Sequence, residues 1–323
     1  MLEQFFPREF VVFFPYIYLA AGLGLLIFSG NLLVSGSVQI ARHLKISTLV
    51  VGLTIVAYGT SAPEMFISIG AALNNAHDIV LGNVIGSNIA NIACILALVV
   101  IICPISINNR SIAFDYSIMA LATILMLIFG LNGVISFWAG LCFVLILISY
   151  TTFSVIKSRR SAAAKEIEPP TMKPYIAVLM ILAAVGGLYF SSGWFVEGAK
   201  QIAVQWGVSE RIIATSIVAV GTSMPELISS LIAAFRKETD LSIGNIIGSN
   251  FFNIAGVLGI TAIIRPLNIS NQSMFFSDMI WVLGVSLALL LVMLPLSKGR
   301  INRWEGVLLL GVFAAYMIVL YNG

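Results

Sequence analysis

Charge is scarce in this sequence. Charged residues occupy only 10% of its 323 positions, whereas 59% of the residues are hydrophobic. A soluble domain carries about 25% charged residues, so the composition excludes an ordinary soluble domain. The longest polar connection, residues 157–174, is too short to hold a nucleotide-binding domain. An ATP-driven pump is therefore excluded as well.

Reactive side chains are also few. The three cysteines, Cys94, Cys103 and Cys142, lie in or at the end of apolar segments without a Cys-x-x-Cys pair, which is typical of packing residues. His43 and His77 have no partner at metal-ligand spacing. The sequence has no nucleophile with a paired base, no phosphate-binding loop and no basic nucleic-acid patch. We expect no enzyme, no cofactor and no nucleic-acid partner.

Long apolar runs dominate what is present. A run of about 20 apolar residues can cross a bilayer as a helix. We predict an all-α polytopic membrane protein with ten transmembrane helices. The expected spans are 14–41, 46–73, 79–102, 112–130, 134–156, 175–203, 209–235, 241–263, 274–294 and 304–321.

One peptide is written twice, at an offset of 162 residues. Gly59-Thr60-Ser61-Ala62-Pro63-Glu64 recurs as Gly221-Thr222-Ser223-Met224-Pro225-Glu226, and between positions 54 and 93 the two copies share 21 identities in 40 pairs. We predict two repeats, 1–156 and 175–323, joined by a cytoplasmic linker, 157–174. Because each repeat has an odd number of spans, the second must run inverted in the membrane, as in many secondary transporters.

The basic residues predict the orientation. Of the 17 Lys and Arg residues, 13 fall in the loops after spans 1, 3, 5, 7 and 9. Cytoplasmic loops carry an excess of Lys and Arg, so we expect both termini outside the cytoplasm.

Each copy of the peptide places one acid deep in an apolar span. An ionised carboxylate at the bilayer centre costs about 2.5–3.5 kcal/mol on insertion scales, so Glu64 and Glu226 are expected to have a function. Together they would offer a charge of −2, which one divalent cation neutralises. The alternative is that each acid is protonated and bonds a neighbouring helix.

Hydroxyl groups accompany both acids. Thr60 and Glu64 are four residues apart and share a helix face, with Ser61 beside them, and Thr222, Ser223 and Glu226 repeat the pattern. Pro63 and Pro225 cannot donate backbone hydrogen bonds, so carbonyls near Ala57, Gly59, Ala219 and Gly221 are expected to face a ligand. Such oxygens are the ligands that hard cations prefer.

The second repeated motif, Gly-Asn-x-x-Gly-Ser-Asn, starts the next span of each half. Ser87 and Asn91 share one helix face, as do Ser249 and Asn253. The motif glycines, Gly82, Gly86, Gly244 and Gly248, are expected to allow close helix packing, and Asn88 and Asn250 are expected to point elsewhere.

These paired motifs resemble the α-repeats of the sodium/calcium exchangers within the cation/calcium antiporter superfamily, over nearly the whole chain. The resemblance implies an antiporter in the plasma membrane of a prokaryote that works by alternating access, with a monomer as the functional unit. Glu64 and Glu226 would bind calcium and share sodium, beside Thr60 and Thr222. The resemblance further implies flanking sodium sites from Ser61 and Ser249 with the Ala57 carbonyl and from Ser87 and Ser223 with the Ala219 carbonyl, and a middle lined by Asn91 and Asn253.

Coupling follows from the charge of this site. Family members usually exchange three sodium ions for one calcium ion, and some relatives carry Asp where this chain has Asn253. With amides at both central positions the core charge stays at −2, so we expect electrogenic, potassium-independent exchange. A proton-coupled or potassium-dependent exchanger and a cation channel are the alternatives.

Overall fold

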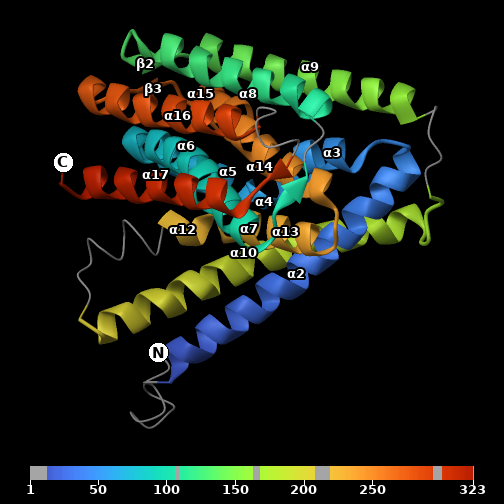
Figure 1. Ribbon diagram of the computed structural model, residues 1–323. Coiled ribbons are helices and arrows are strands. Elements are labelled where there is room, and N and C mark those ends of the chain that lie inside the picture. The colour runs from blue at the N-terminus through green and yellow to red at the C-terminus, as the bar shows by residue number, and fades with distance from the viewer. Residues whose placement is uncertain (1–12, 107–108, 163–167, 208–218, 294–299, 323) are drawn as a thin grey trace.

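The computed structural model describes residues 13–106, 109–162, 168–207, 219–293 and 300–322 of the chain (Figure 1). Within them, eight helices are long and apolar enough to cross a membrane, and a ninth span results if one bent helix pair is counted. The chain is thus an integral, multi-pass membrane protein. Residues 209–218 of the seventh expected span lie outside the described residues.

The first half contains these elements, in chain order: α2 (Phe14–Leu44), α3 (Thr48–Val51), η2 (Gly52–Val56), α4 (Ala57–Thr60), α5 (Ala62–Leu73), α6 (His77–Ala90), η3 (Asn91–Leu96), α7 (Ala97–Ile102), β1 (Ile105–Ser106), α8 (Asn109–Gly130), β2 (Val134–Ile135) and α9 (Phe137–Ala162). The η elements are π-helical turns. Two expectations were wrong in detail: the span expected over 134–156 starts with a strand, and the span expected over 46–73 is bent by 47° after Thr60.

The second half repeats this order. It contains α10 (Pro174–Gln205), α12 (Ala219–Thr222), α13 (Met224–Phe235), α14 (Thr239–Phe252), η5 (Asn253–Leu258), α15 (Gly259–Ile264), β3 (Leu267–Asn268), α16 (Gln272–Met293), β4 (Arg300–Ile301) and α17 (Arg303–Asn322). From α12 to β3, each described element lies 162 residues after its counterpart in the first half.

Four two-residue strands connect the halves, and the sequence gives no sign of them. β1 pairs with β4, with Ile105 opposite Ile301, and β2 pairs with β3, with Ile135 opposite Leu267. Because β3 is the counterpart of β1, and β4 of β2, the two pairings are the same contact made twice with the halves exchanged. Each of these two-stranded ribbons, β1–β4 and β2–β3, therefore joins one half to the other.

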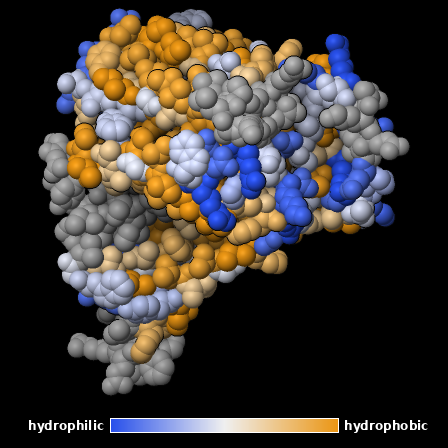
Figure 2. Space-filling model, viewed as in Figure 1, coloured by the Kyte–Doolittle hydropathy of each residue, from blue (hydrophilic) through white to orange (hydrophobic). Residues whose placement is uncertain are grey.

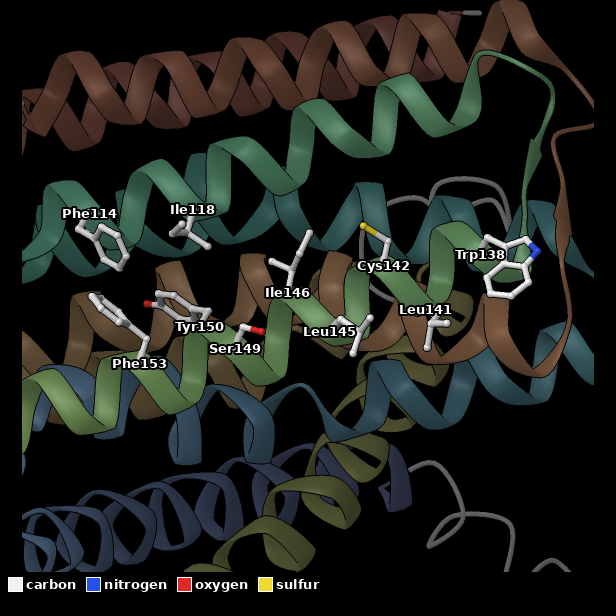
Figure 3. Close-up of a pocket in the computed structure, with 10 residues that line it drawn as sticks. All are labelled: Phe114, Ile118, Trp138, Leu141, Cys142, Leu145, Ile146, Ser149, Tyr150 and Phe153. Carbon is white, nitrogen blue, oxygen red and sulfur yellow. The ribbon is translucent and has the colours of Figure 1, made fainter.

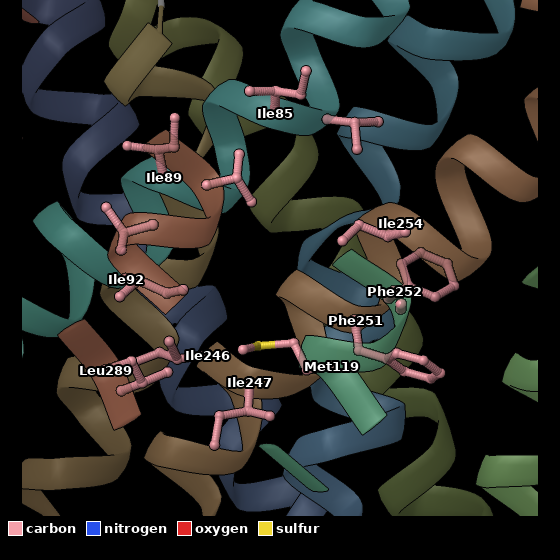
Figure 4. Close-up of a cluster of buried hydrophobic side chains, with 14 of the residues drawn as sticks. Ile85, Ile89, Ile92, Met119, Ile246, Ile247, Phe251, Phe252, Ile254 and Leu289 are labelled. Atoms are coloured by element: carbon pink, nitrogen blue, oxygen red, sulfur yellow. The ribbon is translucent and has the colours of Figure 1, made fainter. Parts of the chain in front are cut away.

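Two long composite helices form the centre of the molecule. The most apolar windows of His77–Ile102 and Thr239–Ile264 are 78% and 89% buried, against 22–39% for the remaining long helices. Between them lies a dense apolar core, in which Ile85 and Ile89 of α6 lie with Ile246, Ile247 and Phe251 of α14 (Figure 4).

The outer helices present apolar side chains outward. α2 and α10 lie antiparallel and side by side along one edge of the bundle (Figure 1). Large apolar residues such as Phe28, Leu182 and Phe190 are exposed on this pair. Figure 2 shows hydrophobic residues over much of the molecule, with hydrophilic residues gathered toward the end where α2 and α9 terminate. An apolar surface of this extent suits a lipid environment.

Candidate functional site: a buried oxygen cluster between the halves

Both repeated acids stand at the start of a helix. The bent span is interrupted at Ser61 (φ −87°, ψ 11°), and Ser223 has nearly the same backbone conformation (φ −89°, ψ 11°). Pro63 and Pro225 lie in the first turns of α5 and α13, where a missing N–H costs nothing. Glu64 and Glu226 follow in the same turns. The positive end of each helix dipole therefore faces a carboxylate.

Hydrogen bonds between the halves bring the two copies of the motif together. Ser61 Oγ donates to Glu226 Oε1 over 2.8 Å. Thr60 Oγ1 donates to Asn245 Oδ1 over 3.2 Å and lies 3.4 Å from Ser249 Oγ. Residues 165 to 189 positions apart in sequence thus share one site.

The two carboxylates are buried without cationic side chains. Glu64 and Glu226 are each 1% exposed and lie within electrostatic reach of one another. In the part of the chain that the structure describes, neither is paired with Lys or Arg; the ion pair found there joins Arg42 to Glu168. Two buried acids that interact electrostatically require a neutralising partner, because a buried charge is stable only when it is paired, bound to a metal ion or protonated.

Several buried polar atoms of the site have no hydrogen-bond partner within the described residues. More than nine-tenths of buried polar groups in proteins are hydrogen-bonded, so a cluster of exceptions indicates a ligand position. The oxygens concerned are Glu64 Oε2, Glu226 Oε2, Asn91 Oδ1, Asn253 Oδ1 and Ser223 Oγ. All five are of the carboxylate, amide and hydroxyl types that Ca²⁺ and Na⁺ accept.

A π-helical turn starts at each central amide. η3 begins at Asn91 and η5 at Asn253. Each turn packs against the acid-bearing helix of the opposite half, η3 against α13 and η5 against α5. Single π-helical turns inside α-helices are frequent at functional sites, because they shift the register of the side chains that follow.

Close backbone contact seats α14 against the interrupted span. A Cβ atom added to Gly244 would lie 2.6 Å from the Leu49 carbonyl oxygen, and one added to Gly52 would lie 2.6 Å from the Leu241 carbonyl oxygen. A Cβ atom added to Gly248 would lie 2.7 Å from the Leu53 carbonyl oxygen. The expected packing role is confirmed for Gly244 and Gly248. For Gly82 and Gly86, the positions that correspond to Leu49 and Leu53, which are 211 and 215, lie outside the described residues.

The remaining predicted site residues take the following places. Ser87 and Ser249 are buried on α6 and α14, and Thr222 is half-buried at the end of α12. Of Ala219, only the backbone is described, at the first residue of α12.

The expectation of free carbonyls was wrong at two positions. The Ala57 carbonyl accepts bonds from Ser61 N (3.0 Å) and Thr60 Oγ1 (3.3 Å), because the chain closes a turn there before it breaks. The Gly221 carbonyl, which Pro225 releases from helix bonding, accepts a bond from Ser192 Oγ of α10 (2.8 Å).

Two asparagines that sequence reasoning missed hold the acid-bearing helices. Asn83 Nδ2 donates to the Glu64 carbonyl oxygen (3.1 Å) and Ser68 Oγ (2.9 Å). Asn245 Nδ2 does the same for the Glu226 carbonyl oxygen (3.4 Å) and Ser229 Oγ (2.9 Å). Both are the Asn of the repeated Gly-Asn pair, so their recurrence at the offset of 162 was the signal available.

Asn88 is a further correction. It was expected to point away from the centre, yet its Oδ1 accepts a hydrogen bond from Asn253 Nδ2 (3.2 Å). Asn250, in contrast, donates to the Ile246 carbonyl oxygen one turn back in its own helix, as a structural residue does.

The predicted site residues that contact one another form a polar cluster between the halves. A groove of about 590 Å³ lies elsewhere, along α8 and α9, and is lined by mostly apolar side chains (Figure 3). None of the predicted site residues lines it. Among the described residues there is also no group of three or more His, Cys, Asp or Glu placed to hold a metal ion, so a cation at this site would meet two carboxylates and neutral oxygens.

This arrangement has a counterpart among known proteins. The family described as sodium/calcium exchanger protein matches residues 14–156 and 176–322. The chain belongs to the sodium/calcium exchanger family. It is therefore a transporter and not an enzyme, and its ions are cargo and not cofactors.

Individual relatives align over almost their full lengths. CaxA of Alkalimonas amylolytica is 37% identical over 314 residues, which cover 95% of this chain and 98% of the relative. The sodium/calcium exchanger MaX1 of Methanosarcina acetivorans is 30% identical over 350 residues, with 95% and 98% covered. The solved structure of the sodium-calcium exchanger NCX_Mj soaked with 10 mM Na⁺ and 10 mM Sr²⁺ has a TM-score of 0.80 at 32% identity, covering 97% of this chain and 99% of that one.

Proposed function

We propose that this antiporter exchanges sodium for calcium by alternating access, with both ions bound between its halves. The observation that carries the proposal is a cluster of buried oxygens that have no hydrogen-bond partner within the described residues, around two buried carboxylates that form no ion pair there. A hard cation satisfies both features at once, because it neutralises the acids and accepts the free lone pairs. Calcium would be held by Glu64 and Glu226, beside Thr60 and Thr222.

Sodium would occupy flanking positions. One would use Ser61, Ser249 and the Ala57 carbonyl; the other would use Ser87, Ser223 and the Ala219 carbonyl. Contacts of Ser61 with Glu226 and of Ser249 with Thr60 support the first grouping. The Ala57 carbonyl would have to exchange its bond from Thr60 for a sodium ion. Asn91 and Asn253 would line the middle.

The stoichiometry follows from charge. With amides at both central positions the two glutamates set the site at −2, so one Ca²⁺ leaves it neutral and three Na⁺ leave it at +1. Exchange of three sodium ions for one calcium ion would then move one net charge per cycle. No third acid calls for potassium, which favours potassium-independent over potassium-dependent exchange.

The architecture proposed for this mechanism has ten helices in two inverted five-helix repeats, 1–156 and 175–323, with a cytoplasmic linker at 157–174. The offset of 162 residues and the exchanged strand pairs support the internal symmetry. The Lys and Arg distribution favours both termini outside the cytoplasm. The bacterial and archaeal relatives favour the plasma membrane of a prokaryote, and the site needs only one chain.

Isotope uptake tests the function. Purified protein in liposomes should take up ⁴⁵Ca²⁺ when an outward Na⁺ gradient is imposed, and should not respond to K⁺ or H⁺ gradients of the same size. Uptake that requires K⁺ or H⁺ would favour the corresponding alternative. Uptake that needs no counter-ion and does not saturate would indicate a channel.

A further inference from the structure

One contact at the centre of the site has no role in the proposal above. Asn253 Nδ2 donates to Asn88 Oδ1 over 3.2 Å, and this bond joins η5 of the second half to α6 of the first. Both side chains are at least 98% buried, Asn88 being 2% and Asn253 1% exposed. The other end of the Asn253 amide, Oδ1, has no partner within the described residues.

An amide differs from a carboxylate in having two unlike ends. The amide oxygen accepts hydrogen bonds and can bind a cation. The NH₂ group carries two donor hydrogens and repels a cation. A central Asn is therefore a cation ligand in only one of its two orientations, related by a half-turn of the amide. Aspartate presents an oxygen at either end, so the same position occupied by Asp needs no such control.

We propose that Asn88 is a positioning residue that fixes the orientation of the Asn253 amide, so that Oδ1 is the end available to the cation. An acceptor at Asn88 holds the NH₂ group of Asn253 away, and a half-turn would bring two oxygens, Asn88 Oδ1 and Asn253 Oδ1, against each other. Asn88 thus allows a neutral amide to do the work of a ligand without adding a third negative charge. This inference rests on the proposed cation site.

Within the described part of the chain, the other half shows no equivalent restraint. Asn250, the counterpart of Asn88, donates to Ile246 in its own helix and leaves its Oδ1 unpartnered. Asn91, the counterpart of Asn253, has neither amide atom bonded within the described residues. Orientation control is therefore a property of the Asn88–Asn253 pair, and Asn250 supplies a matched control of the same residue type and depth.

A double-mutant cycle tests the inference through calcium binding to purified protein, measured by equilibrium dialysis with ⁴⁵Ca²⁺ and without transport. Asn88→Leu keeps the number and branching of the side-chain heavy atoms but removes the acceptor. The lost hydrogen bond is worth about 1 kcal/mol, and without it the Asn253 amide is free to turn its NH₂ group toward the cation. Calcium binding should therefore weaken roughly 5- to 10-fold. In the Asn253→Asp background, Asn88→Leu should change the affinity less than about twofold. Asn250→Leu should have the same effect in both backgrounds.

Equal losses from Asn88→Leu in both backgrounds would overturn the inference, because they would mean that Asn88 only supports packing. Unchanged affinity of the single variant would overturn it as well. Elution as one monodisperse peak on size exclusion establishes that each variant is folded. If the unmodified chain binds no calcium, the proposed function itself fails, a result distinct from a failed cycle in a calcium-binding protein.

Discussion

At the scale of single residues, the energetic problem of this molecule is concentrated in Glu64 and Glu226. Each is 1% exposed, and one oxygen of each has no hydrogen-bond partner within the described residues. A structural pair of protonated acids would use those oxygens in bonds to neighbouring helices. Dividing the ligands between two carboxylates and several neutral oxygens suits reversible binding, because the site must also release its ion.

Removing one of these charges should disable the site. Glu64→Gln leaves the shape of the side chain unchanged but halves the site charge, and loss of one partner from a buried charged contact costs about 2–5 kcal/mol. Calcium binding should weaken by about 30-fold or more, and sodium-driven uptake should cease. Glu197→Gln, at an exposed position on α10, is the matched control and should transport normally. Normal exchange in Glu64→Gln would show that the site is elsewhere.

The hydroxyl beside Glu226 should have a smaller effect. Ser61→Ala removes the 2.8 Å bond to Glu226 Oε1, and a bond to a charged group contributes about 1.5–3 kcal/mol. The calcium concentration at which sodium-driven uptake reaches half its maximal rate should rise roughly 10-fold. Ser117→Ala removes a hydroxyl that bonds within exposed α8 and serves as the control. Equal behaviour of the two variants would exclude Ser61 from the site.

At the scale of elements, the two halves use the same devices: a break at Ser61 or Ser223, a proline in the next turn, and a π-helical turn at Asn91 or Asn253. Apolar run length predicted the helices well, because spanning a bilayer fixes it. The bend and the π-helical turns could not be predicted, because they depend on contacts between the halves. The Asn88–Asn253 bond joins residues 165 positions apart and was missed for the same reason.

The contact of α14 with the interrupted span should tolerate no added carbon. Gly244→Ala would place Cβ 2.6 Å from the Leu49 carbonyl oxygen, and overpacking of this kind costs about 1–3 kcal/mol. The thermal unfolding midpoint in detergent should fall, and calcium binding should weaken with it. Gly284→Ala, where no described atom lies within 4 Å of the new Cβ, should leave both unchanged. A Gly244→Ala variant as stable as Gly284→Ala would contradict the packing described here.

At the scale of the whole molecule, two similar halves enclose one site and hold each other through ribbons at β1–β4 and β2–β3. Duplication and the position of the acids were visible in the sequence, and they predicted that the two acid-bearing motifs meet across the halves, as Ser61 and Glu226 do, but not the bond between Asn88 and Asn253. The ribbons were not visible, because two-residue strands leave no periodic pattern.

Charge movement is the whole-molecule prediction. Three sodium ions leaving for each calcium ion entering carry one net positive charge out of the liposome. An inside-positive potential should therefore speed calcium uptake and an inside-negative potential should slow it. Moving one charge across 100 mV corresponds to about 2.3 kcal/mol. A potential of about 60 mV should therefore change the ratio of inside to outside calcium concentration at equilibrium tenfold. Uptake that is indifferent to a potential set by valinomycin and K⁺ would show electroneutral exchange.

The position of the bound ion tests the central claim most directly. Crystals soaked in Sr²⁺, a heavier analogue of Ca²⁺, should give an anomalous difference peak between the carboxylates of Glu64 and Glu226. The peak should lie at coordination distance from their oxygens, which is about 2.3–2.6 Å for Ca²⁺ and slightly longer for the larger Sr²⁺. The same peak should disappear in Glu64→Gln crystals. A strong peak away from both glutamates, or none at a concentration that supports transport, would contradict a cation site between the two halves.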